Sequence, residues 1–522
     1  MTSNSKTIIQ DIRQEFEMLL NFVSGEQAQQ VTADHIERGL FKLLLAMGAK
    51  LLMLFFVMRS EACSRETHQT ATGATLVYER DTKRSYYSIF GKLPLYRPYF
   101  YQKGVGGESP LDAALGLGAD SYSDLLREVA DYLGVYNVYH KSGDILSRLL
   151  GLKLSTGAIE SNIAIDAGDV ESYYAQKPAP PPLEEAEILV IQADGKGVPM
   201  VLEAPLEPQV RLGKGQKRGR KQEAMVTSIY TIAAHIRTPQ AVVDSFFRPN
   251  SVTASPNRSR PQHKHIWATL AGKAAALARL AQQVASREGN HIRARVALCD
   301  GYEPLQTRIT HQFPNFTLIL DFIHADEYLW DVANVLLGEQ HPHRLEWMAD
   351  HTLKILSGQT QQVIASFQSM AHDKQYTPTQ RAQLEKTATY FQRNLPYMAY
   401  DTYLKRGWPI ASGVIEGACR HFVKDRCELS GMRWTQIGVE NLFRLRAVAE
   451  NGDWDEYHRF RKRQRHTRLY HQPYPEPLPL EMQAIDPSSW PQKRPVSATL
   501  QIIEPSPPPD PHPLYHQLPL AV

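Results

Sequence analysis

Four acidic residues and one histidine, drawn from distant parts of the chain, could together bind metal ions. Asp194 follows an apolar run in EILVIQADGKG, Asp300 another in RVALCDGYE, and Asp321 a third in FTLILDFIH. Glu416 opens a helical pattern in GVIEGACRHFVKDR. Because an unpaired charge is costly in a protein core, acids at the ends of buried strands predict a cation between them. Two metal ions held by carboxylates are a common catalyst of phosphodiester cleavage and transfer.

Each of these acids also has an ordinary structural explanation. Asp194 and Asp300 precede glycines and could lie in turns, since Asp and Gly favour turns. Glu203, on the next predicted strand, is a weaker alternative to Asp194. Asp321 could cap a helix, and His324 could be a nearby residue whose hydrogen bonds are made within the protein. If both side chains share one face, the histidine could instead order a metal-bound carboxylate or contact a phosphate.

Basic and aromatic residues accompany the acids. Arg420 and Lys424 follow Glu416 by one and two helical turns, which places all three on one face. These residues could simply form a surface ion pair. Alternatively, Glu416 could bind a metal ion while Arg420 and Lys424 bind a phosphate backbone. The glycine-rich basic segment 211–222 could likewise be a solvated loop or a backbone contact. The candidate DNA-binding residues are Lys196, Lys214, Lys217, Arg218, Arg220, Lys221, Arg420, His421, Lys424, Arg426, Arg433 and Trp434.

The chain as a whole has an ordinary globular composition. Its 522 residues are 43% hydrophobic and 22% charged, with a net charge of only +3. Its four cysteines include no CxxC pair, which argues against a zinc ribbon or a disulfide scaffold. A polar start predicts no signal peptide and a cytoplasmic protein. Residues 39–60 are long enough to span a bilayer, but they contain Lys42 and Lys50, so we predict a buried amphipathic helix.

The N-terminal half is predicted to be helical around a small β module. Residues 1–66 form two helices, and residues 67–117 form a hairpin-rich module. Residues 118–176 begin with apolar residues at helical spacing, namely Leu125, Leu126, Val129, Tyr132 and Leu133. A helix over 145–150, a turn at Gly151 and a helix capped by Ser155 follow. This helix-turn-helix layout could bind DNA or be a plain two-helix corner.

The C-terminal half is predicted to be an α/β core interrupted by helices. A proline-rich linker at 177–187 precedes it. Strand and helix patterns then alternate over 188–324, which predicts antiparallel strands first and parallel strands later. Residues 406–450, which carry the predicted helix of Glu416, complete the core. Within this core, residues 265–289 are predicted to form one long helix. Residues 325–405 are an all-helical insertion.

The end of the chain is rich in proline. Residues 466–522 are predicted to be extended or disordered. The basic run 459–468, just before them, could be a DNA-contacting helix end or a solvated face.

The order of these motifs resembles the DDE transposases of bacterial insertion sequences, in the ISKra-type branch related to Mutator-like elements. The similar motifs are ADGKG, LCDGYE with FPN, LDFIH, a helical insertion, and SGVIEGACRHFVKDR with SGMRW. The resemblance covers about residues 187–450, and the string around Glu416 is its most specific part. PLDAALGL and the helix-turn-helix candidate extend it into the N-terminal half.

The resemblance implies an α/β, ribonuclease-H-like catalytic core with an all-helical insertion, preceded by a helical and hairpin DNA-binding region. It places the catalytic acids and metal ligands on Asp194, Asp300 and Glu416, and an accessory D-x-x-H motif on Asp321 and His324. Two Mg²⁺ or Mn²⁺ ions would be the cofactors. The partners would be DNA, meaning terminal inverted repeats and a target, and further copies in a dimer or larger synaptic complex. Neither a membrane nor a small-molecule substrate is expected.

In one respect the chain departs from this family. Relatives often carry paired cysteines before the PLD motif, but YFYQKGVGGESPLD has none, so no structural zinc is expected. Two other functions stay open: a ribonuclease-H-like nuclease, and an inactive, transposase-derived DNA-binding regulator.

Overall fold

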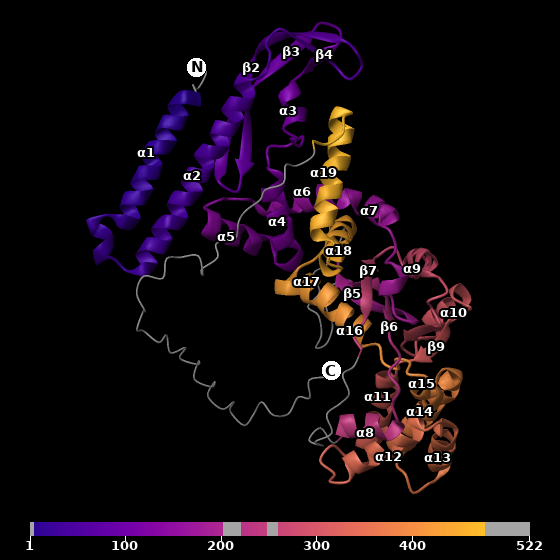
Figure 1. Cartoon of the computed structure of the whole chain (residues 1–522). Helices are drawn as coiled ribbons and strands as arrows, with labels where there is room; N and C mark the ends of the chain where they lie inside the picture. Colours follow the sequence, from indigo (N-terminus) through magenta and orange to yellow (C-terminus); the bar gives the residue numbers. More distant parts are fainter. Residues whose placement is uncertain (1–4, 202–220, 248–258, 476–522) are drawn as a thin grey trace, which may run out of the picture. The chain divides into compact units, whose positions relative to one another are not determined.

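The computed structural model in Figure 1 describes residues 5–201, 221–247 and 259–475. The chain divides into two compact units, residues 1–474 and 475–522, and the first is described below. It is a mixed α/β protein with two β-sheets. Outside the described residues lie Glu203, the predicted DNA contacts Lys214, Lys217, Arg218 and Arg220, and the predicted tail from residue 476 onward. The predicted start of that tail at residue 466 is wrong, because residues 466–470 belong to a helix, α19 (Trp454–Tyr470), in which His466 is buried.

Two helices that pack side by side begin the chain (Figure 1). Helices α1 (Ser5–Ser24) and α2 (Ala33–Glu61) are joined by a short 3-10 turn. Among the described residues, α2 is the one helix long and apolar enough to cross a membrane. The predicted helix is confirmed, but its predicted burial is wrong: only Phe56 and Ser60 of α2 are buried. The reason is that α2 packs on α1 and on strand β3, which leaves a third face open.

An antiparallel sheet follows, as the hairpin pattern predicts. Its order is β1-β2-β3-β4, with strands β1 (Thr67–Gln69), β2 (Thr75–Ser88), β3 (Gly91–Gln102) and β4 (Gly106–Glu108). Phe56 of α2 packs on this sheet in a small apolar cluster. Asp112, in the PLD motif, forms ion pairs with Arg84 and Arg97 of the hairpin. Packing and ion pairs therefore hold this module together.

Five helices complete the N-terminal half. They are α3 (Pro110–Ala114), α4 (Asp124–Tyr136), α5 (Tyr139–Leu150), α6 (Thr156–Asp166) and α7 (Val170–Gln176). Gly151 ends α5 in the left-handed conformation, with φ 69°. The Ser155 hydroxyl accepts the Ala158 N–H at 3.1 Å and so caps α6. The predicted turn and cap are confirmed, although α5 begins earlier than predicted.

The second sheet has the order β7-β6-β5-β8-β9. Its strands are β5 (Ile188–Pro199), β6 (Lys221–Ile232), β7 (Gln262–Thr269), β8 (Ala294–Cys299) and β9 (Thr317–Leu320). Strands β5, β6 and β7 pair antiparallel, whereas β8 pairs parallel with both β5 and β9. This confirms the predicted change from antiparallel to parallel strands.

Two segments of this sheet differ from the sequence prediction. Strand β5 continues through Asp194–Gly197, which pairs with β6, so there is no turn at this acid. Residues 265–269 belong to β7 and not to a long helix, which begins only at Lys273 after Gly272, whose φ is 90°. The apolar pattern around Trp267 is compatible with either a helix or a strand. Pairing with β6 stabilises the strand.

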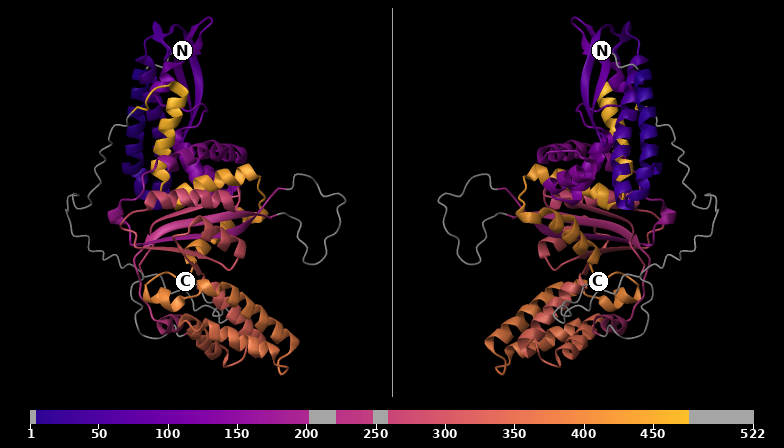
Figure 2. Two further views of the ribbon diagram at one scale, coloured as in Figure 1. Left: turned by 90° about the vertical axis from the view of Figure 1, so that its right-hand side faces the viewer. Right: turned by 90° about the vertical axis from the view of Figure 1, so that its left-hand side faces the viewer.

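Helices cover the sheet and form the insertion. Helices α8 (Pro239–Phe247), α9 (Lys273–Arg287) and α10 (Glu303–Gln312) lie between strands in the sequence. The insertion consists of α11 (Phe322–Leu337), α12 (Arg344–Leu356), α13 (Thr360–His372), α14 (Pro378–Asn394) and α15 (Tyr400–Lys405). Figure 2 shows α11 to α14 packed together, in orange tones. The predicted helical insertion is confirmed in these described residues.

The last helices connect the two halves of the unit. They are α16 (Gly413–Gly417), a π-helix at Ala418–Lys424, α17 (Asp425–Cys427), α18 (Gln436–Glu450) and α19 (Trp454–Tyr470). Val135, Tyr139 and Ile159 of the N-terminal half belong to the same buried cluster as Leu442 and Val448 of α18. The linker at 177–187 therefore joins segments that share one core.

Candidate metal centre

Three of the predicted acids lie in one row across neighbouring strands. Continuing the parallel register of β5 with β8 places Asp194 level with Asp300. Continuing that of β8 with β9 places Asp300 level with Asp321. Adjacent strands are about 4.8 Å apart, so the three backbone positions lie within about 10 Å of one another.

The alternation of side chains puts two of these acids on the same face of the sheet. Val190 of β5 and Leu298 of β8 pack into the cluster that contains the insertion helices. Ile191 of β5 faces the opposite cluster, formed with α9 and α10. Because every second side chain points to the same face, Asp194 and Asp300 lie on the side of Val190 and Leu298.

Two buried polar side chains fasten α16, which carries Glu416, to this face. Gln192 Oε1 accepts the Ile415 N–H at 2.9 Å. Ser412 donates its backbone N–H, at 3.0 Å, and its hydroxyl to Asp321 Oδ2. The same hydroxyl lies 3.4 Å from Glu416 Oε1. Ser412 thus ties the acid after β9 to the acid of α16.

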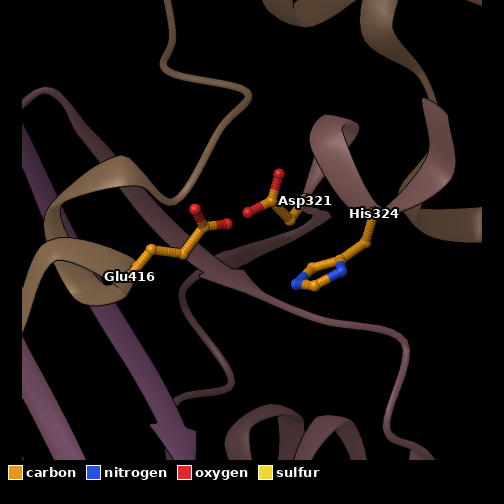
Figure 3. A group of neighbouring side chains, drawn as sticks. All are labelled: Asp321, His324 and Glu416. Atoms are coloured by element: carbon orange, nitrogen blue, oxygen red, sulfur yellow. The ribbon is translucent and has the colours of Figure 1, made fainter. Parts of the chain in front are cut away.

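Asp321, His324 and Glu416 could hold a metal ion (Figure 3). One ligand atom from each lies within 4.8 Å of the others. In Figure 3 the Glu416 carboxylate points toward Asp321, and the His324 ring lies beside both. His324 Nδ1 is 3.1 Å from Glu327 Oε2. This contact orients the ring and leaves Nε2 available as a ligand, as in many metal sites.

Burial and neighbouring carboxylates shift the pKa values of Asp300, His324 and Glu416. Burial is the largest cause that raises the pKa of Asp300, and the carboxylate of Asp194 raises it further. Burial, followed by the carboxylate of Asp321, also raises the pKa of Glu416. Burial acts to lower the pKa of His324, but the surrounding carboxylates outweigh it and the net shift is upward. A divalent cation would relieve this repulsion and keep the acids ionised.

The three side chains that could hold one metal ion, Asp321, His324 and Glu416, share only Glu416 with the predicted catalytic triad. Asp321 and His324, which the sequence assigns to an accessory motif, are the residues closest to it. Asp194 lies on β5 and Asp300 directly after β8, and the Asp194 carboxylate raises the pKa of Asp300. All five predicted residues therefore lie at one end of the sheet, with the histidine and Glu416 on the side of β9.

Asp194 has its own local environment. Its Oδ1 accepts the Gly195 N–H at 2.6 Å, and its Oδ2 accepts the thiol of Cys419 at 3.3 Å. Cys419 lies in the π-helix directly after α16. Such helices are rare and are often found at functional sites.

Several predicted DNA-binding residues are exposed around the acids. Arg420, His421 and Lys424 of the π-helix are exposed, as is Arg433. His421 is 2.9 Å from Asp425. Lys196 is half-buried on β5, and Lys221 pairs with Glu428.

For Arg426 and Trp434 the predicted DNA contact is wrong. Both are buried, at 1% and 6% exposure. The Arg426 guanidinium donates to the Gly134 carbonyl and lies 5.0 Å from the rings of Tyr139 and Trp434. Trp434 donates its indole N–H to the Cys427 carbonyl at 3.1 Å. These two residues join the C-terminal segment to the N-terminal helices.

Three arginines in the basic run of α19 form ion pairs within the protein. Arg461 pairs with Asp166, and Arg465 and Arg468 pair with Asp124 and Asp169. These arginines hold α19 against the N-terminal half.

The exposed face of α6 offers little positive charge. Its exposed residues are Thr156, Gly157, Glu160, Ser161, Ala164 and Ile165. Lys153 and Arg148, just before α6, are the nearest exposed cations in the helix-turn-helix segment. A backbone contact would therefore fall at the turn, rather than along the helix.

Ser412 and Gln192 are site residues that the sequence analysis missed. A signal existed for Gln192, because it is a polar residue in the apolar strand ILVIQA, two positions before Asp194 and hence on the same face. No local pattern marks Ser412, whose partner Asp321 is 91 residues earlier in the chain.

Comparison with known proteins does not extend this description. No family model matches the chain, and no curated protein matches it.

Proposed function

We propose that the protein is a DDE transposase of an insertion sequence, which cuts and transfers DNA strands at terminal inverted repeats. The grouping of Asp194, Asp300, Asp321, His324 and Glu416 at one end of a mixed sheet supports the proposal most strongly. The motif resemblance and the helical insertion before Glu416 add support. The strand arrangement is compatible with a ribonuclease-H-like core. Such an enzyme works on chromosomal DNA, in the cytoplasm of a bacterium.

The donor set fits hard divalent cations. Carboxylate oxygens are the ligands that Mg²⁺ and Mn²⁺ prefer, and Asp194, Asp300 and Glu416 would hold two such ions, with Asp321 and His324 beside them. Two bound ions would activate the attacking hydroxyl and stabilise the leaving oxygen of the phosphodiester.

The chain's own groups would align the substrate. Ser412 holds the Asp321 carboxylate in place through two hydrogen bonds, and Glu327 orients the His324 ring. The exposed cations Arg420 and Lys424 would bind the phosphate backbone on either side of the cleaved bond. The N-terminal half would recognise the inverted repeat.

Cleavage of labelled DNA tests this proposal. Duplexes carrying the flanking inverted repeat are incubated with the wild type and Glu416→Gln, in Mg²⁺ or Mn²⁺. We expect metal-dependent 3′-hydroxyl ends from the wild type and a loss of about 100-fold or more in the variant, with DNA binding retained. Glu385→Gln is the matched control, since it makes the same change on an exposed position of α14.

Other outcomes would point elsewhere. Equal cutting by both proteins would remove Glu416 from the site. DNA binding without cutting, unaffected by a chelator, would favour the regulator. Cutting without strand transfer would favour a nuclease.

A further inference from the structure

A row of apolar side chains on α2 is exposed to solvent. This row, which we call the α2 seam, consists of Phe41, Leu44, Gly48, Leu51, Phe55 and Met58. Apart from the glycine, its members are 44–56% exposed. Their spacing alternates between three and four residues, the pattern with which one helix packs along another in a coiled coil.

Helix α1 adds a second row. Phe16, Leu20 and Val23 are spaced by four and three residues and are 38–52% exposed. Because α1 and α2 pack side by side (Figure 1), the hairpin presents two apolar rows.

The other faces of α2 are occupied. One packs on α1, where Lys50 pairs with Glu15 and Gly39 lies against the ring of Phe22. Another packs on the N-terminal sheet through Phe56. The seam is a third face. The ring of Phe90 lies against it at Gly48, and the exposed fractions of its other members show that the described residues leave the rest of it open.

We propose that the α2 seam and the apolar row of α1 dock against the same two helices of a second copy, forming a four-helix dimer interface. Eight half-exposed side chains present about 700 Å² of mainly apolar surface, more than monomers usually leave in one patch. A stable interface buries about 800 Å² on each partner. The hairpin alone therefore supplies nearly the area that a dimer needs.

A second copy fits this surface better than a membrane does. Residues 5–61 contain six basic and seven acidic residues, so two identical hairpins do not repel each other. A helix that lies on a membrane is usually flanked by basic residues, and this hairpin has no such excess. A membrane-spanning α2 would have to break the Lys50–Glu15 pair and leave the sheet. The dimer does not rest on the proposed function.

Sedimentation equilibrium of the full-length protein tests the interface. The variant Leu44→Glu/Leu51→Glu places charges on the seam. The control, Ala46→Glu, places one at an exposed residue of α2 that lies outside the seam. We expect twice the mass of one chain for the wild type and the control. The double variant should associate at least about tenfold more weakly, with unchanged circular dichroism. A monomeric wild type, or an unchanged dimer of the double variant, would overturn the proposal.

Cross-linking gives a second, independent test that does not disturb the charge. Leu51 lies near the middle of the seam, so it lies close to its own copy when the two seams pack centre to centre. In a Cys63→Ser background, which leaves only buried cysteines, Leu51→Cys should form a disulfide-linked dimer and Ala46→Cys should not. The proposal fails if Leu51→Cys stays monomeric, or reacts only after removal of residues 476–522. It also fails if the wild type is monomeric and pellets with phosphatidylglycerol vesicles.

Discussion

Asp131 of α4 and Asp166 of α6 occupy one buried site in the N-terminal half. Asp166 forms ion pairs with Arg127 and Arg461. Among the described groups, no N–H or O–H donates to either oxygen of Asp131. Burial, and then the Asp166 carboxylate, raise the pKa of Asp131 well above 3.8. A proton held on Asp131 would give this side chain a hydrogen bond to the Asp166 carboxylate.

This pair makes the stability of the protein depend on pH. The folded protein keeps the Asp131 proton at pH values where the unfolded chain, with a pKa near 3.8, has lost it. The free energy of unfolding therefore falls as pH rises from 3.8 through the folded pKa. We expect Asp131→Asn, which is neutral at every pH, to weaken this fall and to change stability by about 1 kcal/mol or less at pH 5. Urea unfolding of the wild type and the variant between pH 4 and 8 measures this pH dependence of stability.

Asp166→Asn is the contrasting variant. It leaves Arg127 and Arg461 buried without their shared carboxylate, which should cost about 3–5 kcal/mol. Burial acts to raise the pKa of Asp166, but the two arginines outweigh it and lower the pKa. The contribution of the Asp166 carboxylate to the free energy of unfolding is therefore lost only as pH falls below 3.8. Equal losses in the two variants at pH 7 would contradict this assignment of the proton.

At the scale of elements, the turn between α5 and α6 provides a matched pair of glycines. Gly151 has a φ of 69°, whereas Gly157 lies within α6. A Cβ at either position would meet no described atom within 4 Å. Gly151→Ala should therefore lower the free energy of unfolding by about 1 kcal/mol through backbone strain alone. Gly157→Ala should raise it by about 0.5 kcal/mol. Thermal unfolding compares them, and a stabilising Gly151→Ala would contradict the left-handed conformation.

Local signals explain what the sequence could predict. Gly151 and Ser155 mark a turn and a cap that need only neighbouring residues. Apolar runs that end in Asp300 and Asp321 are strands in the structure, because buried parallel strands require such runs. The acids of the candidate site could be named for the same reason.

Partners distant in the sequence explain what could not be predicted. The apolar pattern of α4 suggests a core face that includes Leu125 and Tyr132, yet these are exposed and Arg127 and Asp131 are buried. The ion pairs with Asp166 and Arg461 that permit this burial come from other helices. In the same way, the burial of Arg426 depends on Gly134 and Tyr139, nearly 300 residues earlier.

At the scale of the whole molecule, the shared core predicts that the two sides of the linker unfold together. Arg446 of α18 donates to the carbonyls of Val135 and Phe422, and Lys177 pairs with Asp453. A protease site placed in the exposed segment 178–179 should therefore yield two pieces that stay together on gel filtration. They should separate only at the urea concentration that unfolds the intact chain. Separation in buffer, or two unfolding transitions, would show two independent domains.

The shared core also affects synthesis of the protein on the ribosome. Val135 and Ile159 emerge early, but their partners Leu442 and Val448 follow about 300 residues later, roughly 15–60 s at common translation rates of about 5–20 residues per second. During that interval the apolar faces of the N-terminal helices are uncovered and open to chaperones. Glu416 also emerges late. A chain that stops early, from a nonsense mutation or a stalled ribosome, would thus lack both a finished core and the complete candidate metal centre.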